Sequence, residues 1–442
     1  MLKKVVGKDE LSGARIDIAH ASFPAPFASG LEYAAPARGT WNIVHTGMLI
    51  PEAHEIFVCA AGCLRGVVLT AAEMGASERF STVEIRENNV IEGNMEELLI
   101  DGVTDILQRL PQAPPAVLVY TSCIHHFMGT DLGLAYRTLG ERFPNVEFTD
   151  CYMTPTMRKS GLTPDQIMRK QLYSLLTPVA REEKSVNIIG NDFATDETSE
   201  LVRLIRESGW TLRDITLCRT YAEYKKMAGS SVNISYAPAA MAGGEELKKR
   251  LGQEHMYLPL SYGYDEIERN LWALSERLGV EKRDYTREKE NADAALKKAL
   301  EVVGETPVEI DYTVTPRPLG LARLLLEHGF NVTRLYVDSI TAEEKDDFEK
   351  LKRAYPDLEL NATVHAEMRV TKRVRGEKTL AIGQKAAYFT GTPYFVNVVE
   401  GGGMYGFDGI GRMARLIAEA FSEKKDMRGL IQIKGLGCGC MI

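Results

Sequence analysis

Three cysteines in the first third of the chain stand where thiolates could hold a metal cluster. Cys59 and Cys63 are four residues apart in FVCAAGCLRG, where small residues lead into an apolar, helix-compatible segment, and Cys123 ends the apolar run APPAVLVYTSC. Small residues let a bulky inorganic cluster approach the backbone, and a helix N-terminus favours a thiolate. Three thiolates are fewer than the roughly four ligands of zinc or of an iron–sulfur cluster, and no second C-x2-C supports a zinc knuckle. The alternative is that they are buried apolar thiols.

The other cysteines and two histidines of the chain are also candidates for a role in this chemistry. His125 and His126 follow Cys123 directly, and either is a proton donor near a cluster or part of a polar loop. Cys151 and Cys218 lie in strand-like segments and are expected to be core thiols. The C-terminal sequence GLGCGCMI places Cys438 and Cys440 in a C-x-C pair, for which a metal ligand, a redox pair and an unstructured end all stay open.

Two further groups of residues suggest contacts with a ligand. The segment EGGGMYG has a G-x-G-x-x-G spacing at Gly401, Gly403 and Gly406. Too little chain follows for a full dinucleotide-binding half, so a loop bordering a bulky cofactor is an equal alternative. The basic run from Arg369 to Lys378 is a candidate for holding an anionic ligand, and the alternative is that it forms a solvated loop. Arg317 in TPRPLG is a similar candidate. No G-x-x-x-x-G-K-[ST] occurs, so the chain should not hydrolyse ATP through a P-loop.

The elements that must position these residues follow one pattern repeated along the chain. Apolar strands alternate with helices, which predicts an α/β protein with three Rossmann-like domains, each a parallel sheet flanked by helices. We expect the domains to span residues 1–183, 184–303 and 304–442. Sites in such sheets lie beyond the carboxyl ends of the strands. Cys123, Tyr236 and the segment 315–318 all follow such strand ends.

Length and composition limit the function classes. The chain has 442 residues, which predicts two or three domains, and a net charge of −8, which argues against binding nucleic acid or an anionic membrane. No apolar run reaches bilayer length, and the N-terminal sequence MLKKVVGKDELSG lacks the apolar part of a secretory signal. We therefore expect a cytoplasmic protein, in which seven cysteines are thiols or metal ligands rather than a disulfide framework.

Longer segments extend these observations to a family. AAGCLRG, VEIRENNVIEGNMEELLIDGVTDIL and PPAVLVYTSCIHHFMGTDL together resemble the first domain of nitrogenase component 1, a family that includes nitrogenase molybdenum–iron proteins and tetrapyrrole reductases. NISYAP and LPLSYGYDEI continue the resemblance, and LAIGQKAAYFTGTPYF and YGFDGIGRMARLI resemble the third domain. The resemblance covers nearly the whole chain.

The resemblance implies a site and its partners. Cys63 and Cys123 fall on two of the family's cluster-ligating cysteines, whereas the third, expected near residues 31–33, is missing. Cys59 is its substitute by position alone. The resemblance implies an oxidoreductase carrying a [4Fe-4S] or larger P-cluster-like cluster, supplied with electrons by an ATP-hydrolysing iron–sulfur reductase. It also implies a homodimer or a pairing with a paralogous chain.

The resemblance also bears on the substrate. The family's nitrogenase cofactor needs a cysteine in the second domain and a histidine in the third, and neither matching position has one. We therefore expect no molybdenum or vanadium. The expected substrate is a small organic molecule or a tetrapyrrole-like macrocycle, held by Tyr236, Arg317, Arg369 and the 401–406 loop. A scaffold that assembles a metallocluster, which the family also contains, is the alternative to a reductase.

Overall fold

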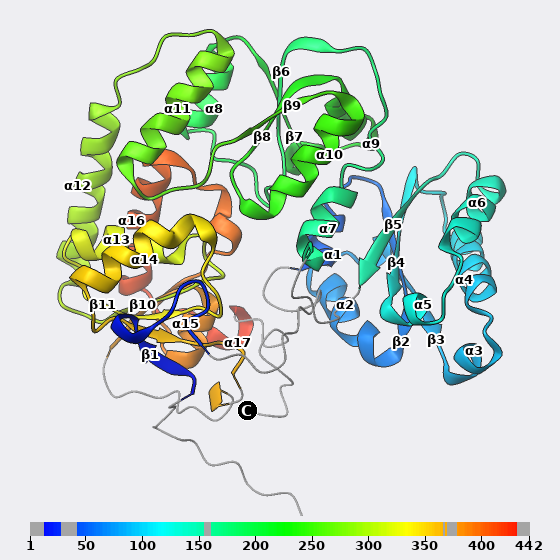
Figure 1. Ribbon diagram of the computed structural model, residues 1–442, viewed down its shortest axis with the longest axis horizontal. Helices are drawn as coiled ribbons and strands as arrows, with labels where there is room; N and C mark the ends of the chain where they lie inside the picture. The colour runs from blue at the N-terminus through cyan, green and yellow to red at the C-terminus, as the bar shows by residue number, and fades with distance from the viewer. Residues whose placement is uncertain (1–12, 28–41, 154–160, 366, 369–377, 431–442) are drawn as a thin grey trace, which may run out of the picture. The chain divides into compact units, whose positions relative to one another are not determined.

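The computed structural model describes residues 13–27, 42–153, 161–365, 367–368 and 378–430. Its described strands form three sheets of mainly parallel strands with helices between them (Figure 1), which confirms the predicted α/β class. The chain divides into two compact units. Unit 1 comprises residues 1–30, 193–209 and 259–433, and unit 2 comprises residues 31–192, 210–258 and 434–442. The three predicted domain ranges therefore stay a prediction.

The first sheet lies in unit 2 and has the strand order β3-β2-β4-β5. Its strands are β2 (His54–Ala60), β3 (Phe80–Ile85), β4 (Ala116–Ser122) and β5 (Glu147–Met153). The helices of this part are α1 (Ile43–Gly47), α2 (Ala61–Glu73), α3 (Glu87–Glu92), α4 (Met95–Arg109), α5 (Cys123–Phe127), α6 (Leu132–Arg142) and α7 (Pro164–Gln171).

Both faces of this first sheet are buried, as the continuous apolar run of β4 predicts. Leu118 and Tyr120 belong to one apolar cluster, with Phe57 and Cys59. Val117 and Val119 belong to another cluster on the opposite face, with the apolar side of α4. The alternation along β4 follows from the two-residue period of a strand. Because both faces of the sheet are apolar, polar residues and thiols are left for the carboxyl ends of the strands.

The second sheet, also in unit 2, has the order β7-β6-β8-β9 and is parallel throughout. Its strands are β6 (Glu182–Ile188), β7 (Thr211–Asp214), β8 (Ser230–Ser235) and β9 (Glu254–Tyr257), and its helices in this unit are α9 (Tyr221–Lys226) and α10 (Met241–Leu251). The strand predicted over residues 186–189 is confirmed as β6, which begins four residues earlier.

The third sheet lies in unit 1 and has the order β1-β12-β11-β10-β13-β14. Its strands are β1 (Arg15–Asp17), β10 (Val308–Asp311), β11 (Val332–Tyr336), β12 (Glu359–Asn361), β13 (Leu380–Ile382) and β14 (Phe395–Val396). The helices of this unit are α8 (Glu200–Glu207), α11 (Tyr264–Leu278), α12 (Thr286–Val303), α13 (Pro318–Glu327), α14 (Lys345–Ala354), α15 (Gln384–Thr390), α16 (Gly406–Ser422) and α17 (Met427–Leu430). The N-terminal strand β1 pairs antiparallel with β12, so residues 15–17 extend the third sheet although the sequence placed them with the first domain.

All three sheets share one feature of strand order. In each, the first parallel strand (β2, β6 or β10) lies in the interior, and the next strand along the chain joins one side, where β12 also follows in the third sheet. The chain then continues with a strand on the other side of the first one. The strand order therefore reverses at β2/β4, at β6/β8 and at β10/β13. Right-handed connections leave a crevice at the carboxyl end of each such switch point, where ligands of α/β proteins bind.

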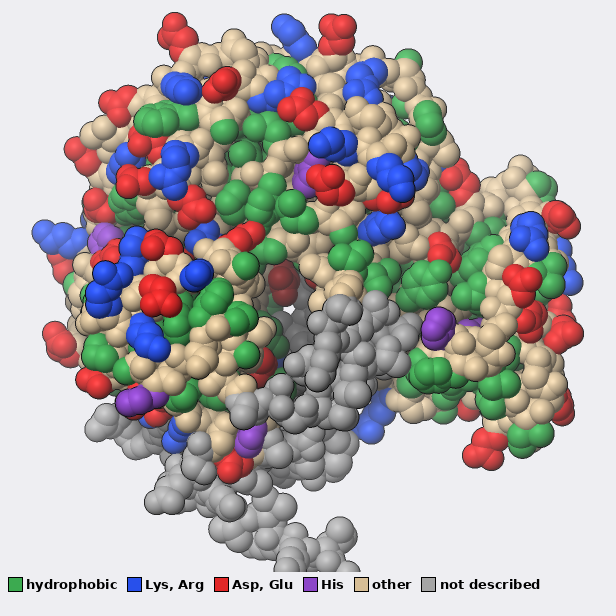
Figure 2. All heavy atoms as spheres, in the orientation of Figure 1, with side chains coloured by type: hydrophobic (Ala, Val, Ile, Leu, Met, Phe, Trp, Pro, Cys, Tyr) green, Lys and Arg blue, Asp and Glu red, His purple; other side chains and the backbone are tan. Residues whose placement is uncertain are grey.

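No described helix combines the length and apolar character that crossing a bilayer requires. On the face drawn in Figure 2, basic and acidic side chains are interspersed over the described surface. This face therefore offers no continuous basic patch for nucleic acid.

Candidate metal centre

The three candidate thiols lie at the switch point of the first sheet. Strands β2 and β4 are parallel neighbours, with Val58 opposite Thr121. Cys59 is the penultimate residue of β2, Cys63 lies in the first turn of α2, and Cys123 is the first residue of α5. Cys123 thus starts a helix where the sequence predicted the end of a strand, and Cys59 belongs to the strand rather than to a loop.

The thiols are close enough to change one another's ionisation. Burial raises the pKa of Cys59, which has no exposed surface, and the neighbouring Cys63 and Cys123 raise it further. Burial also raises the pKa of Cys63, and Cys123 adds to this effect. The raised pKa keeps the Cys59 and Cys63 thiols protonated at neutral pH until a positive charge binds beside them. Metal ions supply such a charge and release the thiol protons when they bind.

A single metal ion does not fit this site. Within the described ranges, no three or more His, Cys, Asp or Glu side chains lie close enough together to hold one ion. An iron–sulfur cluster is a larger body whose ligands bind different irons, so its cysteines lie farther apart than the ligands of one ion. The donor set, three thiols without a carboxylate, is the soft set that such clusters take.

A buried hydrogen-bond donor beside Cys123 also fits a cluster. His125 is 1% exposed, and its Nδ1 accepts a hydrogen bond from the backbone N–H of Ser122 at 3.2 Å. Burial lowers the pKa of His125 to about 4, so the ring is neutral and carries its proton on Nε2. Nε2 is buried and has no hydrogen-bond partner among the described residues. Leaving a buried N–H unpaired costs about 1–3 kcal/mol, which a sulfur acceptor would recover in part.

The hydroxyl of Ser122 behaves in the same way. Ser122 is the last residue of β4, and its Oγ is buried without a hydrogen bond of normal geometry in the described structure. Ser122 and His125 thus flank Cys123 with two unused donors. His125 was recognisable as a candidate in the sequence, whereas the only signal for Ser122 was its position at a strand end. His126 is exposed and packs near Phe127.

Apolar side chains are exposed at the same edge of the sheet. Helices α3 and α5 begin just past the ends of β3 and β4, the two strands that flank β2. Ile91 on α3 is 81% exposed and Phe127 on α5 is 71% exposed, and Met128 follows directly. Exposed apolar residues of this size at one edge are typical of a surface that another protein covers.

The remaining cysteines lie elsewhere. Cys151 belongs to the buried apolar cluster around Phe57 and Tyr120, which confirms the predicted core thiol. Cys218 packs partly buried against the same cluster, and its Sγ contacts the carbonyl oxygen of Asp214 at 3.3 Å. Cys438, Cys440 and residues 31–33 lie outside the described residues.

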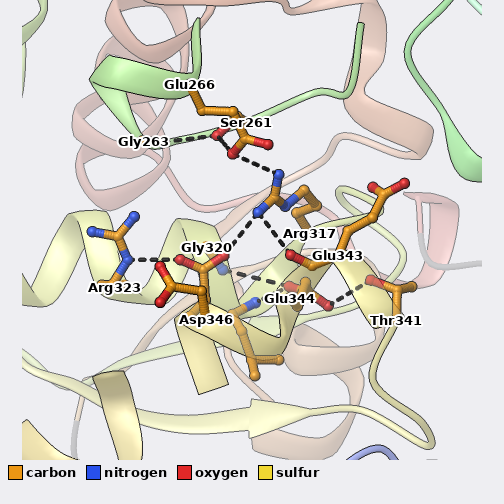
Figure 3. A network of polar contacts seen from close by, with 12 residues as sticks. Ser261, Gly263, Glu266, Arg317, Gly320, Arg323, Thr341, Glu343, Glu344 and Asp346 are labelled. Carbon is orange, nitrogen blue, oxygen red and sulfur yellow. Dashed lines mark hydrogen bonds and ion pairs between the residues drawn. The ribbon is translucent and has the colours of Figure 1, made fainter. Parts of the chain in front are cut away.

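Arg317 is held by carboxylates of its own chain (Figure 3). Its Nη1 donates to Glu266 Oε2 at 2.9 Å, and its Nη2 donates to Asp347 Oδ2 at 3.1 Å. Burial alone would lower the pKa of this guanidinium, but the two carboxylates together outweigh burial and raise it above its ordinary value. The neighbouring Glu344 accepts from the backbone N–H of Leu319 at 2.7 Å and so caps α13. Arg317 therefore joins α11, α13 and α14, and its predicted contact with an anionic ligand stays a prediction.

The glycine-rich loop packs closely on its own unit. A Cβ at Gly403, where φ is +81°, would lie 2.1 Å from the carbonyl oxygen of Ala194, and one at Gly406 would lie 2.3 Å from Glu200 Oε2. At Gly401 the nearest atom would be 3.7 Å away, on Leu260. A close backbone contact thus requires glycine at 403 and a close side-chain contact disfavours any other residue at 406, and all three glycines have a positive φ. No described strand follows α16, so a dinucleotide-binding half is not formed here.

Tyr236 and Arg369 are the other two residues predicted to contact a ligand. Tyr236 directly follows β8 at the switch point of the second sheet and is 7% exposed. Arg369 lies outside the described residues. A role for either in binding a substrate stays a prediction.

Comparison with known proteins agrees with this architecture. A family model described as Nitrogenase component 1 type Oxidoreductase matches residues 44–422. Among solved structures, one titled "Nitrogenase Cp1 at pH 6.5" has a TM-score of 0.65 at 14% identity over 89% of this chain and 94% of that chain. Another, "Nitrogenase Cp1 at pH 5", has a TM-score of 0.56 at 13% identity over 93% and 94%. At these identities the structures show a shared fold. No curated protein matched.

Proposed function

Because the chain belongs to the family of nitrogenase component 1 type oxidoreductases, we propose that it is the catalytic component of a two-component reductase. Members of this family bind iron–sulfur clusters, work with an Fe-protein reductase and form oligomers. In our proposal, Cys59, Cys63 and Cys123 hold a [4Fe-4S] or larger cluster that receives electrons from an ATP-hydrolysing partner. The observation that carries the proposal is the convergence of three thiols and two unused buried donors at one switch point.

The protein's own residues would act on the cluster through ligation and hydrogen bonding. When bound, the cluster supplies one-electron chemistry at low potential. The thiols of Cys63 and Cys123 would lose their protons and bind iron, and buried Cys59 would complete the set from β2. The Nε2–H of His125 would donate to a sulfur atom, which orients the ring and stabilises negative charge at the site.

A second protein chain would close the site. Three thiolates leave one coordination position short, and the apolar residues Ile91, Phe127 and Met128 are exposed at the same edge. We propose that an identical or paralogous chain covers this edge. Native mass measurement should then give a dimer or larger assembly, and a monomer that retains its full iron content would contradict this part.

The substrate is proposed to be a small organic molecule or a tetrapyrrole-like macrocycle. The positions that would hold a nitrogenase-type heterometal cofactor carry neither cysteine nor histidine. Elemental analysis should therefore find no molybdenum or vanadium in active protein. Near-stoichiometric amounts of either metal would refute this expectation.

A cluster-assembly scaffold is the second candidate. Incomplete ligation by three thiols lets a cluster leave as well as stay, so the same site suits transfer to another protein. Steady turnover with an ATP-dependent reductase would identify a reductase. Loss of iron to an acceptor protein without turnover would identify a scaffold.

Iron content tests the site itself. Protein purified without oxygen should be brown and contain iron and sulfide, and Cys63→Ala or Cys123→Ala should lose most of the iron. Cys218→Ala is the matched control, because this thiol is also partly buried in unit 2 but follows β7 of the second sheet rather than a strand of the first sheet. A colourless wild-type protein without iron after anaerobic reconstitution would rule out the proposed centre.

A further inference from the structure

A lysine is buried at the switch point of the third sheet. Lys385 is 1% exposed and lies in the first turn of α15, three residues after β13 ends. Its Nζ donates to the hydroxyl oxygen of Tyr312 and, at 3.3 Å, to Thr363 Oγ1. Nζ also lies 4.3 Å from the centroid of the Tyr312 ring. Tyr312 itself directly follows β10 and is half-buried.

The two residues face each other across the point where the strand order reverses. Strands β10 and β13 are parallel neighbours, with Ile310 opposite Ile382. The chain proceeds from β10 to β11 and β12 on one side and returns through β13 to β14 on the other. Tyr312 and Lys385 thus occupy the place in the third sheet that the thiols occupy in the first, where α/β proteins bind ligands.

The ammonium group of Lys385 forms no direct ion pair with another described residue. Among the described residues its ammonium group has hydroxyl partners and no ion pair. Burial raises the pKa of the Asp311 carboxyl group and the charge of Lys385 acts to lower it, but that carboxylate accepts hydrogen bonds from the backbone N–H groups of Ala386 at 2.7 Å and Thr313 at 2.8 Å. A buried ammonium without a direct ion pair is unfavourable and is seldom found unless it has a role.

The hydrogen-bond donors that stay unused on Lys385 and Tyr312 determine which chemical group of a ligand can bind there. An ammonium group has three donors, and Tyr312 and Thr363 accept from two of them. The hydroxyl of Thr363 donates to Asp338, so it offers nothing further. Tyr312 accepts from Lys385, which leaves the phenol proton free to donate away from the lysine. One ammonium N–H and one phenol O–H therefore stay available side by side.

We propose that Lys385 and Tyr312 bind a carboxylate group of a small organic ligand. Two adjacent donors match the two oxygens of a carboxylate, and one positive charge matches its single negative charge. Phosphate, with more charge and more oxygens, is usually held by several N–H groups or by arginine. The inference names the chemical class of the substrate in the proposed function, but it rests on unit 1 alone.

Binding of succinate to the full-length protein tests this site without iron or a partner protein. Succinate should raise the melting temperature of the wild type in a saturable way, and more than phosphate or sodium chloride at equal ionic strength. Lys385→Met should weaken succinate binding about tenfold or more, since a charge-assisted hydrogen bond is lost. Tyr312→Phe should weaken it less. Lys350→Met, at an exposed lysine of α14, should bind succinate as the wild type does.

A structural role for the lysine predicts the opposite pattern. If Lys385 only supports the fold, Lys385→Met without ligand should melt well below the wild type, and succinate should act equally on both. If Lys385 serves a ligand, the unliganded variant should melt at or above the wild-type temperature, because a buried charge without a direct ion pair is gone. Absence of a saturable succinate effect in the wild type, or tighter binding of phosphate, would overturn the proposal. Iron content, which reports the proposed centre, should be the same in both proteins.

Discussion

Glu200 should make unit 1 less stable as the pH rises from about 4.5 to about 7. This glutamate is the first residue of α8 and is 3% exposed, and it accepts from the backbone N–H of Asp408 at 3.2 Å. Burial raises its pKa from 4.5 to about 7, although hydrogen bonds from the backbone and the charge of Arg203 act in the other direction. The folded protein therefore favours the protonated carboxyl group.

The sign and size of the effect follow from the two pKa values. Below pH 4.5 the group is protonated whether the chain is folded or unfolded, so it costs nothing. Between pH 4.5 and about 7 the unfolded chain releases the proton while the folded chain retains it, so stability falls as the pH rises. Above about 7 the loss is complete and amounts to about 3 kcal/mol, at about 1.4 kcal/mol for each pH unit.

The substitution Glu200→Gln keeps an oxygen acceptor for Asp408 and removes the charge. At pH 8 it should raise the melting temperature of unit 1 by on the order of 6 °C, because about 1 kcal/mol corresponds to at least about 2 °C for a unit of this size. At pH 4 the variant and the wild type should melt together.

Thermal unfolding of both proteins across this pH range is the assay. Glu197→Gln is the control, since this exposed glutamate of the same segment forms only a surface ion pair with Arg206 and should change stability little. A difference between Glu200→Gln and the wild type that is equal at pH 4 and pH 8 would refute the reasoning.

Three further predictions concern single residues. His125→Phe should retain iron but lower the midpoint potential of the cluster, because a hydrogen bond to sulfur is lost; an unchanged potential in redox titration would exclude that bond. Gly403→Ala should destabilise unit 1 by about 2 kcal/mol or more, since its Cβ would meet backbone at 2.1 Å, while Gly411→Ala in α16 should melt near the wild type. Arg317→Met should destabilise by about 3 kcal/mol in chemical unfolding, since it leaves Glu266 and Asp347 without their shared cation; equal stability would show that the network contributes little.

Local sequence was enough to predict the fold class and the thiol positions. Apolar runs of strand length alternating with helices, such as AVLVYTS in β4, allow few arrangements other than parallel sheets with helices on both faces. In such sheets the residue that follows a strand lies at the ligand-binding edge of the sheet, whatever the position of that strand in the strand order. Cys123 and Tyr236 could therefore be placed at sheet edges from the sequence alone.

Tertiary structure decided which strand ends lie next to one another in a sheet and which charged side chains are paired. Cys59 and Cys123 meet because β2 pairs with β4 and not with a later strand, and strand pairing depends on contacts between distant segments. The same holds for Arg317, whose partners Glu266 and Asp347 lie 51 and 30 residues away. From sequence alone, an arginine after a strand is interpreted as an anion site until its distant carboxylates are known. Lys385, which forms no direct ion pair in the described structure, was not recognisable in QKAAYF. Sequence patterns report which side chains are buried, but the partners of a buried charge are set only when the sheet assembles.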